Sequence, residues 1–141
     1  MSEASLWAWL RERLPEGRYS RIESETSPGF PDVDYTISGI SGTIELKKSR
    51  SPTSNLPFRR GGLRDTQLRW IEDEIEQGGR VFIIAQMGEW IHLFNASDVY
   101  ENFNSMTMIE LHKAALVNLR LRGSPDGLKE KFKGILTAPN G

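Results

Sequence analysis

Two short stretches of the chain alternate between polar and apolar residues. They are residues 32–38 and 43–48, and the glycine-bearing segment Gly39–Gly42 separates them. Alternation with a period of two is typical of a strand with one buried face, and a short loop with glycine joins two such strands into a hairpin. The buried face of this predicted hairpin holds Val33, Tyr35, Ile37, Ile44 and Leu46.

The rest of the pattern predicts a mixed α/β fold. Apolar residues at helical spacing predict one helix over residues 5–14 and another that runs from a cap at Asp65 or Thr66 to Gln77. Further strands are predicted over residues 19–22, 80–85 and 90–94. We therefore expect a single domain, residues 1–141, with a central mixed β-sheet flanked by helices.

Helices are expected to follow the last of these strands. The run Thr107–Glu110 has the form of a capping box and predicts a helix that ends near Gly123. A last helical turn or two is predicted within residues 129–136. On this interpretation the core occupies about residues 5–95, and about residues 96–136 form a C-terminal helical extension.

Composition narrows the class of protein. Of the 141 residues, 38% are hydrophobic and 26% are charged, which is the balance of a soluble globular protein. No stretch approaches the roughly 18 apolar residues of a membrane span. The sequence has no cysteine, which excludes disulfides, thiolate zinc sites and cysteine nucleophiles. It also lacks a signal-peptide pattern, so we expect a cytoplasmic location.

Charge is distributed unevenly, although the net charge is only −1. Residues 47–69 contain seven cations against one anion, and residues 70–76 contain four acids. The local excess of about six positive charges permits contacts with phosphate groups. It also suits a solvated loop that leads into a charged helix.

The polar face of the predicted hairpin carries residues with catalytic potential. If both apolar faces enter the core together, Asp32, Glu45 and Lys47 lie on one common side. Two carboxylates can hold a cation such as Mg²⁺, which polarises a phosphoryl oxygen and lowers the pKa of a bound water. A nearby lysine orients that water and offsets charge that develops in the transition state. The same residues also suit the ordinary solvated face of an antiparallel sheet.

The order of these residues resembles a known nuclease signature. Gly29-Phe30-Pro31-Asp32, followed by Glu45-Leu46-Lys47, is similar to the two halves of the PD-(D/E)XK motif. Arg21-Ile22-Glu23 upstream and a helix that opens with Gln67 downstream resemble the VRR-NUC and Holliday-junction-resolvase branch, small phage-encoded nucleases in particular. The resemblance covers about residues 6–94. It implies a restriction-endonuclease-like core and, for a phage-encoded protein, the cytoplasm of a host cell.

The resemblance also implies a role for each matching residue. Asp32 and Glu45 would bind a divalent metal, Mg²⁺ with Mn²⁺ as a substitute, and the Leu46 carbonyl would be a further ligand. Lys47 would be the catalytic lysine. Gln67 would touch metal-bound water or phosphate.

Related nucleases usually add an acid upstream of the motif. Glu23, on the strand that leads into the motif, is the first choice as catalytic residue and metal ligand, and Glu12, on the first helix, is the alternative. Asp34 and Lys48 rank second, because Asp34 lies one pleat further on and Lys48 points to the face opposite Lys47.

Several cations near the motif are candidate contacts for nucleic acid. The long loop over residues 49–62 either lies along nucleic acid, with Arg59 and Arg60 on phosphates, or is a disordered surface loop. The full set of candidate nucleic-acid-binding residues is Lys48, Arg50, Arg59, Arg60 and Arg64.

The sequence thus predicts a divalent-metal-dependent endonuclease that hydrolyses DNA phosphodiester bonds, with branched DNA or Holliday junctions as candidate substrates. A non-catalytic nucleic-acid-binding module with the same fold and a protein-interaction domain are the alternatives, and DNA is not distinguished from RNA. Junction resolution needs two symmetric cuts and predicts a homodimer. His92 and His112 are isolated in the sequence and are interpreted as structural or surface residues.

Overall fold

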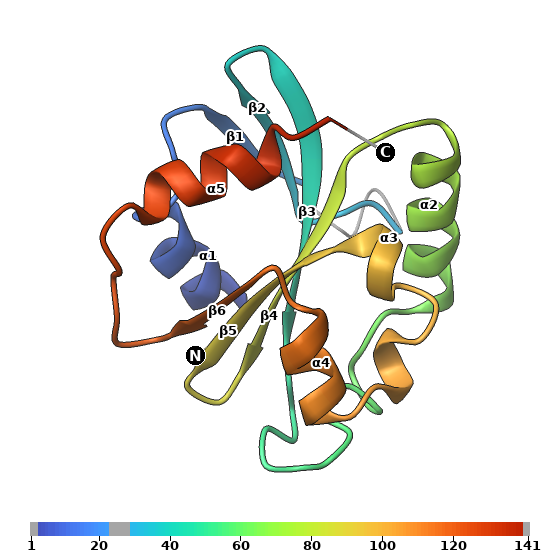
Figure 1. The fold of residues 1–141 in the computed structure, drawn as a ribbon. Coiled ribbons are helices and arrows are strands. Elements are labelled where there is room, and N and C mark those ends of the chain that lie inside the picture. The colour runs from blue at the N-terminus through green and yellow to red at the C-terminus, as the bar shows by residue number, and fades with distance from the viewer. Residues whose placement is uncertain (1–2, 23–28, 140–141) are drawn as a thin grey trace.

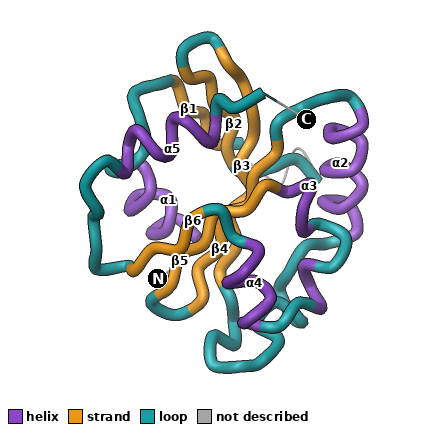
Figure 2. Tube along the Cα trace, viewed as in Figure 1, coloured by secondary structure: helices purple, strands orange, loops and turns teal. Residues whose placement is uncertain are grey.

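The computed structural model describes residues 3–22 and 29–139. Their strands form one six-stranded sheet in the order β1-β2-β3-β4-β5-β6, so each strand pairs with its neighbours in the sequence (Figure 1, Figure 2). The strands are β1 (Arg18–Arg21), β2 (Val33–Ile37), β3 (Ile40–Lys48), β4 (Val81–Met87), β5 (Trp90–Asn95) and β6 (Val117–Arg120). The β3–β4 pair is parallel and the other pairs are antiparallel, which confirms the predicted mixed sheet.

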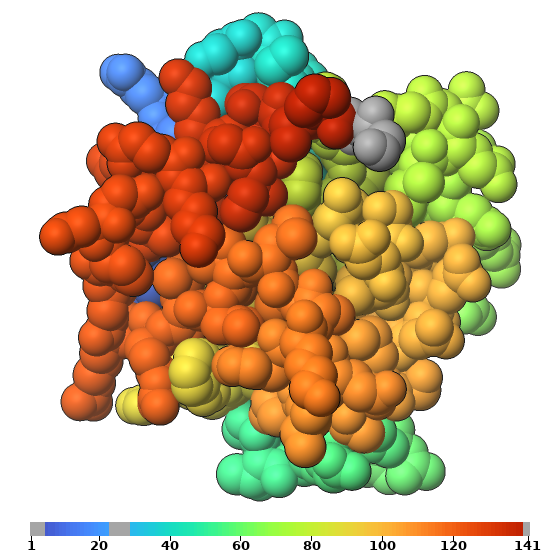
Figure 3. Space-filling view, in the orientation of Figure 1, coloured from blue at the N-terminus to red at the C-terminus, as the bar shows by residue number. Residues whose placement is uncertain are grey.

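Helices cover both faces of this sheet (Figure 1). One face carries α1 (Glu3–Arg11) and α5 (Leu128–Leu136), and the other carries α2 (Asp65–Glu76), α3 (Ala96–Val99), the 3₁₀ turn η1 (Phe103–Ser105) and α4 (Met108–Ala114). In the space-filling view, α4, α5 and the segments next to them hide most of the sheet (Figure 3). Each face therefore has its own buried core, and the predicted α/β class is confirmed.

The β2–β3 hairpin is tighter than the sequence predicted. Ile37 pairs with Ile40, so the loop is only Ser38-Gly39, and both residues have positive φ, 50° and 80°. That is the conformation of a two-residue type I′ turn, which matches the twist of the strands beside it. The predicted four-residue loop was wrong, because its last glycine, Gly42, belongs to β3.

Gly42 lies in the strand because the ring of Tyr35 occupies the place of a side chain there. The two residues are opposite each other in the β2–β3 ladder, and a Cβ on Gly42 would collide with the ring and hydroxyl of Tyr35. That hydroxyl donates a hydrogen bond to the carbonyl of Leu136 in α5, at 2.7 Å. Gly42 therefore permits a buried link between the hairpin and the C-terminal helix.

Two predicted helix boundaries were wrong. The first turn of α2 is capped neither by Asp65 nor by Thr66, because Arg64 is the N-cap residue and its N–H donates to the Gln67 side chain at 2.9 Å. The helix that opens at the Thr107 capping box ends at Ala114 rather than near Gly123. Residues 117–120 instead form β6, with Val117 and Leu119 buried against β5.

The loop between β3 and α2 is anchored to the second core. Phe58 is fully buried and packs against Phe103, with 4.6 Å between ring centroids. The Ser49 hydroxyl donates to the carbonyl of Pro57 at 2.7 Å. No described helix qualifies as a membrane span, since the longest, α2, has 12 residues and a bilayer requires about 20.

Gly42→Ala is expected to lower the free energy of unfolding by about 1–3 kcal/mol, because the new methyl group must displace Tyr35. Urea unfolding measures this. Gly134→Ala is the matched control, since Gly134 lies inside α5 with open space around it, and it should stabilise by about 0.5–1 kcal/mol. Equal midpoints for Gly42→Ala and the wild type would contradict the close approach.

Candidate active site

Strand β3 extends beyond its partner β2, and a side chain takes over the pairing. The β2–β3 ladder ends at Val33 and Ile44, because Asp32 lies just before β2. The Asp32 carboxylate then accepts a hydrogen bond from the Leu46 N–H at 2.7 Å. Since the N–H and C=O of one strand residue point to the same side, the Leu46 carbonyl faces this edge as well.

The next residues of β3 turn their side chains toward α2. Ile44 and Leu46 are fully buried in the core on the α1 side, so Glu45 and Lys47 point to the opposite face. There they are 2% and 8% exposed. Two charged side chains therefore lie inside the protein, where each must find a polar partner.

Gln67 is the partner that both charged side chains share. Its amide nitrogen donates to Glu45 Oε1 at 2.9 Å, and its amide oxygen accepts from Lys47 Nζ at 3.0 Å. The same oxygen caps α2 by accepting from the Arg64 N–H. Lys47 Nζ and Glu45 Oε1 are themselves 4.0 Å apart. One buried amide thus fixes both charged groups and ties them to the positive end of a helix dipole.

We refer to Asp32, Glu45, Lys47 and Gln67 as the acid–lysine cluster. It contains two carboxylates, one ammonium group and one amide, and of its members Asp32 is the one that is partly exposed. Among the described residues, no group of three or more histidine, cysteine, aspartate or glutamate side chains is placed to hold a metal ion. Any cation at the cluster would therefore draw ligands from these two carboxylates, from backbone oxygen and from water.

The other predicted acids do not join the cluster within the described residues. Glu23 lies outside them. Glu12 follows α1, which packs on the face opposite Glu45, and its largely exposed carboxylate lies 3.7 Å from the Arg13 guanidinium. Asp34 is exposed on β2, where it lies opposite Thr43.

The predicted nucleic-acid contacts are mostly at the surface. Lys48 is half-buried at the end of β3, and Arg50 lies over the backbone of the following loop at Gly61. The exposed members of the set are Arg50, Arg59, Arg60 and Arg64. All four belong to the segment that connects β3 to α2, so they share the chain neighbourhood of Lys47 and Gln67.

Sequence reasoning missed an aromatic contact beside the cluster. Phe30 and Trp70 have ring centroids 5.5 Å apart. Phe30 precedes Asp32 by two residues, and Trp70 follows Gln67 by three, which is one helical turn. The closeness of Phe30 to Asp32 and of Trp70 to Gln67 in the sequence could have indicated this contact.

The comparisons with known proteins bear on the fold. No protein-family model matches the sequence, and no curated protein matches it. The structure is similar to that of Hjc, a Holliday junction resolvase from the archaeal hyperthermophile Archaeoglobus fulgidus, with a TM-score of 0.51. The match covers 92% of this chain and 97% of Hjc at 13% sequence identity. The chain therefore has the α/β fold of this resolvase, which confirms the fold that the motif implied. The finer likeness to VRR-NUC and phage nucleases stays a prediction.

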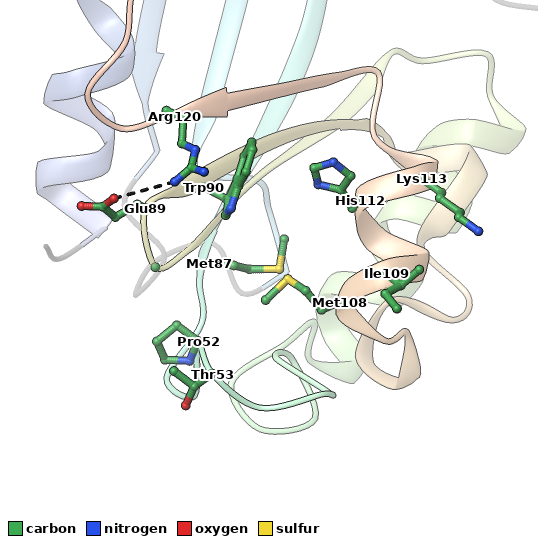
Figure 4. A pocket seen from close by; sticks show the side chains of 11 residues that line it. Pro52, Thr53, Met87, Glu89, Trp90, Met108, Ile109, His112, Lys113 and Arg120 are labelled. Carbon is green, nitrogen blue, oxygen red and sulfur yellow. Dashed lines mark ion pairs between the residues drawn. The ribbon is translucent and has the colours of Figure 1, made fainter.

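A separate hollow of about 630 Å³ lies at the β4–β5 turn and α4 (Figure 4). Its wall is mostly apolar and includes Met87, Trp90, Met108 and Ile109, and none of the acid–lysine cluster lines it. Arg120 lies over the Trp90 ring, 4.2 Å from its centroid, and 3.9 Å from the Glu89 carboxylate.

The two histidines are isolated in sequence but paired in space beside this hollow. His92 Nε2 and His112 Nδ1 are 3.1 Å apart, with His92 fully buried and His112 on the wall. Burial, followed by the nearby His112, lowers the pKa of His92 to about 4. The prediction that these residues are structural or at the surface agrees with their positions.

The buried His92 should make the protein less stable in mild acid. Its folded-state pKa of about 4 lies below the unfolded value of about 6.5, so between these values the unfolded chain binds more protons. The contribution of His92 to the free energy of unfolding should be fully present above pH 6.5. It should fall toward pH 4 by up to about 1.4 kcal/mol per pH unit. Urea midpoints across this range should show a weaker slope for His92→Gln. If the urea midpoint of His92→Gln depends on pH as strongly as that of the wild type, or if only His112→Gln removes this dependence, His92 is not the group responsible.

Gln67→Met should destabilise the protein by about 2–3 kcal/mol, because it leaves the buried Glu45 and Lys47 without their shared partner while it keeps most of the side-chain volume. The measurement is urea unfolding without added metal. Gln77→Met, at the exposed end of the same helix, should stay within about 0.5 kcal/mol of the wild type. A similar result for both variants would show that the shared amide does not hold the cluster.

Proposed function

We propose that the chain is a divalent-metal-dependent endodeoxyribonuclease that acts on branched DNA. The observation that carries this proposal is the acid–lysine cluster, in which Gln67 holds the Glu45 carboxylate and the Lys47 ammonium group while the Leu46 N–H holds the Asp32 carboxylate at the edge of the sheet. Buried charges of both signs with one shared partner are costly to maintain for stability alone. Such groups are common at sites that perform chemistry.

The donor atoms of the cluster fit a hard divalent cation. Asp32 and Glu45 offer carboxylate oxygens, and the Leu46 carbonyl faces the edge at which Asp32 is bound. Oxygen ligands of this kind, completed by water, suit Mg²⁺ and Mn²⁺. Glu23 remains our choice for the additional acid, because Glu12 follows α1 on the opposite face of the sheet and lies beside Arg13. When bound, the cation supplies Lewis-acid stabilisation of the charge that develops on the phosphoryl group.

The chain's own residues then position the reactants. Lys47 Nζ is held in place by Gln67 Oε1, so its remaining hydrogens can be donated to the attacking water and to a phosphoryl oxygen. Gln67 binds Glu45 with its other end and so keeps that carboxylate turned toward the site. Hydrolysis then consists of attack of the oriented water on phosphorus, with its proton lost to solvent, and departure of the sugar oxygen, which takes up a proton from solvent.

The surroundings of the cluster suit a nucleic-acid substrate. Lys48 and the exposed arginines of the β3–α2 segment can contact phosphates on either side of the cut, without reading base sequence. A branched substrate is supported by the likeness of the fold to Hjc, which is a Holliday junction resolvase. Symmetric cutting of a junction would require a homodimer. We place this activity in the cytoplasm.

A non-catalytic nucleic-acid-binding module is the second candidate function for this fold. It explains the arginines, but it gives no role to two carboxylates at a phosphate-binding surface, since these repel the ligand. Salt-sensitive DNA binding that depends on Arg59 and Arg60 but not on Asp32 or Glu45, without any cutting, would favour the module.

The nuclease proposal predicts cleavage of at least one of three DNA substrates, a four-way junction, a single strand or a duplex, in Mg²⁺ or Mn²⁺. Chelation with EDTA should abolish it. Lys47→Ala should lower the cleavage rate by at least about 100-fold, as loss of one transition-state donor does. Asp32→Asn and Glu45→Gln should lower it as well.

Matched controls lie on the exposed face of α5. Lys133→Ala and Glu130→Gln remove the same charges far from the cluster in sequence and should leave cleavage unchanged. Circular dichroism should show that all variants are folded. No cutting by the wild-type protein, or undiminished cutting by Lys47→Ala, would overturn the proposal.

A further inference from the structure

An aromatic pair lies at the surface beside the acid–lysine cluster. Phe30 is 45% exposed, and its ring lies 5.5 Å from that of the partly buried Trp70, at an interplanar angle of 45°. We call these two residues the aromatic pair. The other large hydrophobic side chains found exposed in the described chain, Ile109 and Leu116, are aliphatic and lie near α4.

The backbone holds this pair in a defined place. Gly29 has a φ of 88°, and a Cβ on it would collide with the backbone of Thr66 in the first turn of α2. Thr66 and Trp70 are four residues apart and share one face of that helix. Gly29 and Phe30 therefore pack along the start of α2, and the buried Pro31 leads from them to Asp32.

Both members of the pair are connected to the cluster through very short segments. Only Pro31 separates Phe30 from Asp32, which limits the distance between their Cα atoms to about 7 Å. Trp70 is one turn of α2 from Gln67. Because both connections are this short, a strand whose phosphate lies at the cluster can place a base one or two nucleotides away on the aromatic pair.

A single exposed aromatic residue needs no special explanation. Phe30 is different, because a second ring supports it, a glycine with positive φ precedes it, and buried charges lie nearby. It therefore presents a rigid apolar face to the substrate. Nucleobases bind such faces by stacking, and they do so without regard to sequence. A base inside a duplex has both faces covered by its neighbours, so only an unpaired base can use the pair.

We propose that Phe30 and Trp70 form a stacking site for an unpaired nucleobase, one or two nucleotides from the phosphodiester that is cut. The inference rests on the proposed nuclease function and deepens it. It assigns the preference for branched or frayed DNA to a pair of side chains, since the base pairs next to a branch point or frayed end open more easily than those within a duplex and then supply an unpaired base next to a phosphate.

Binding without cleavage tests the site. In EDTA, fluorescence anisotropy should measure affinity for a labelled single strand of about ten thymidines and for the same backbone with abasic residues, which carries the same phosphate charge. Phe30→Ala should weaken binding of the thymidine strand at least about fivefold. It should leave binding of the abasic strand unchanged.

Substitutions of graded character separate stacking from packing. Phe30→Trp should retain the preference for the thymidine strand, whereas Phe30→Leu, of similar bulk but without a π face, should lose it. Ile109→Ala, which removes an exposed apolar side chain elsewhere, is the control and should bind both strands like the wild type. Equal loss on both strands, or no loss for Phe30→Ala and Phe30→Leu, would overturn the proposal.

The outcome is distinguishable from failure of the nuclease proposal. If the wild-type protein cuts no DNA but shows the base-dependent affinity that Phe30→Ala removes, the stacking site stands and the nuclease does not. If Lys47→Ala abolishes cutting while Phe30→Ala and Phe30→Leu bind and cut like the wild type, the nuclease stands and the stacking site does not.

Discussion

The hydrogen bond from the Leu46 N–H to the Asp32 carboxylate fixes the place of the candidate active site. It exists because β2 begins one residue after Asp32, while β3 continues for four residues past Ile44. At this point a carboxylate replaces a strand as the partner of β3. A polar side chain, a backbone edge and the alternating charges of β3 therefore meet at one position, and unequal strand length is the cause.

The same position places charge inside the protein, which affects how the neighbouring helix can begin. Gln67 accepts from the Arg64 N–H and from Lys47 with one oxygen, so the cap of α2 and the orientation of the lysine depend on the same atom. Movement of the helix start would therefore move the ammonium group. Stability and geometry are coupled here, which is the usual condition of a site whose side chains must be held in advance of the reaction.

Local patterns were sufficient for most of the fold. Alternation placed β2 and β3 on the right residues within a few positions, and the strand predicted over residues 80–85 falls on β4. The errors arose where a tertiary contact gave a residue its role. Gly42 reads as a turn residue until Tyr35 is known to cover it, and residues 117–120 continue a helical pattern until β5 offers an edge to pair with.

The candidate site divides in the same way. The alternation could place Glu45 and Lys47 on one face, but no local pattern contains the distance from Gln67 to either of them, because Gln67 lies 22 and 20 positions further along the chain, beyond a whole loop. The contact between Phe30 and Trp70 is equally non-local. Yet Gln67 and Trp70, which make these two contacts, both lie in the first two turns of α2. That helix links the groups proposed for chemistry to the rings proposed for base recognition, so their separation is set by one rigid element rather than by a loop.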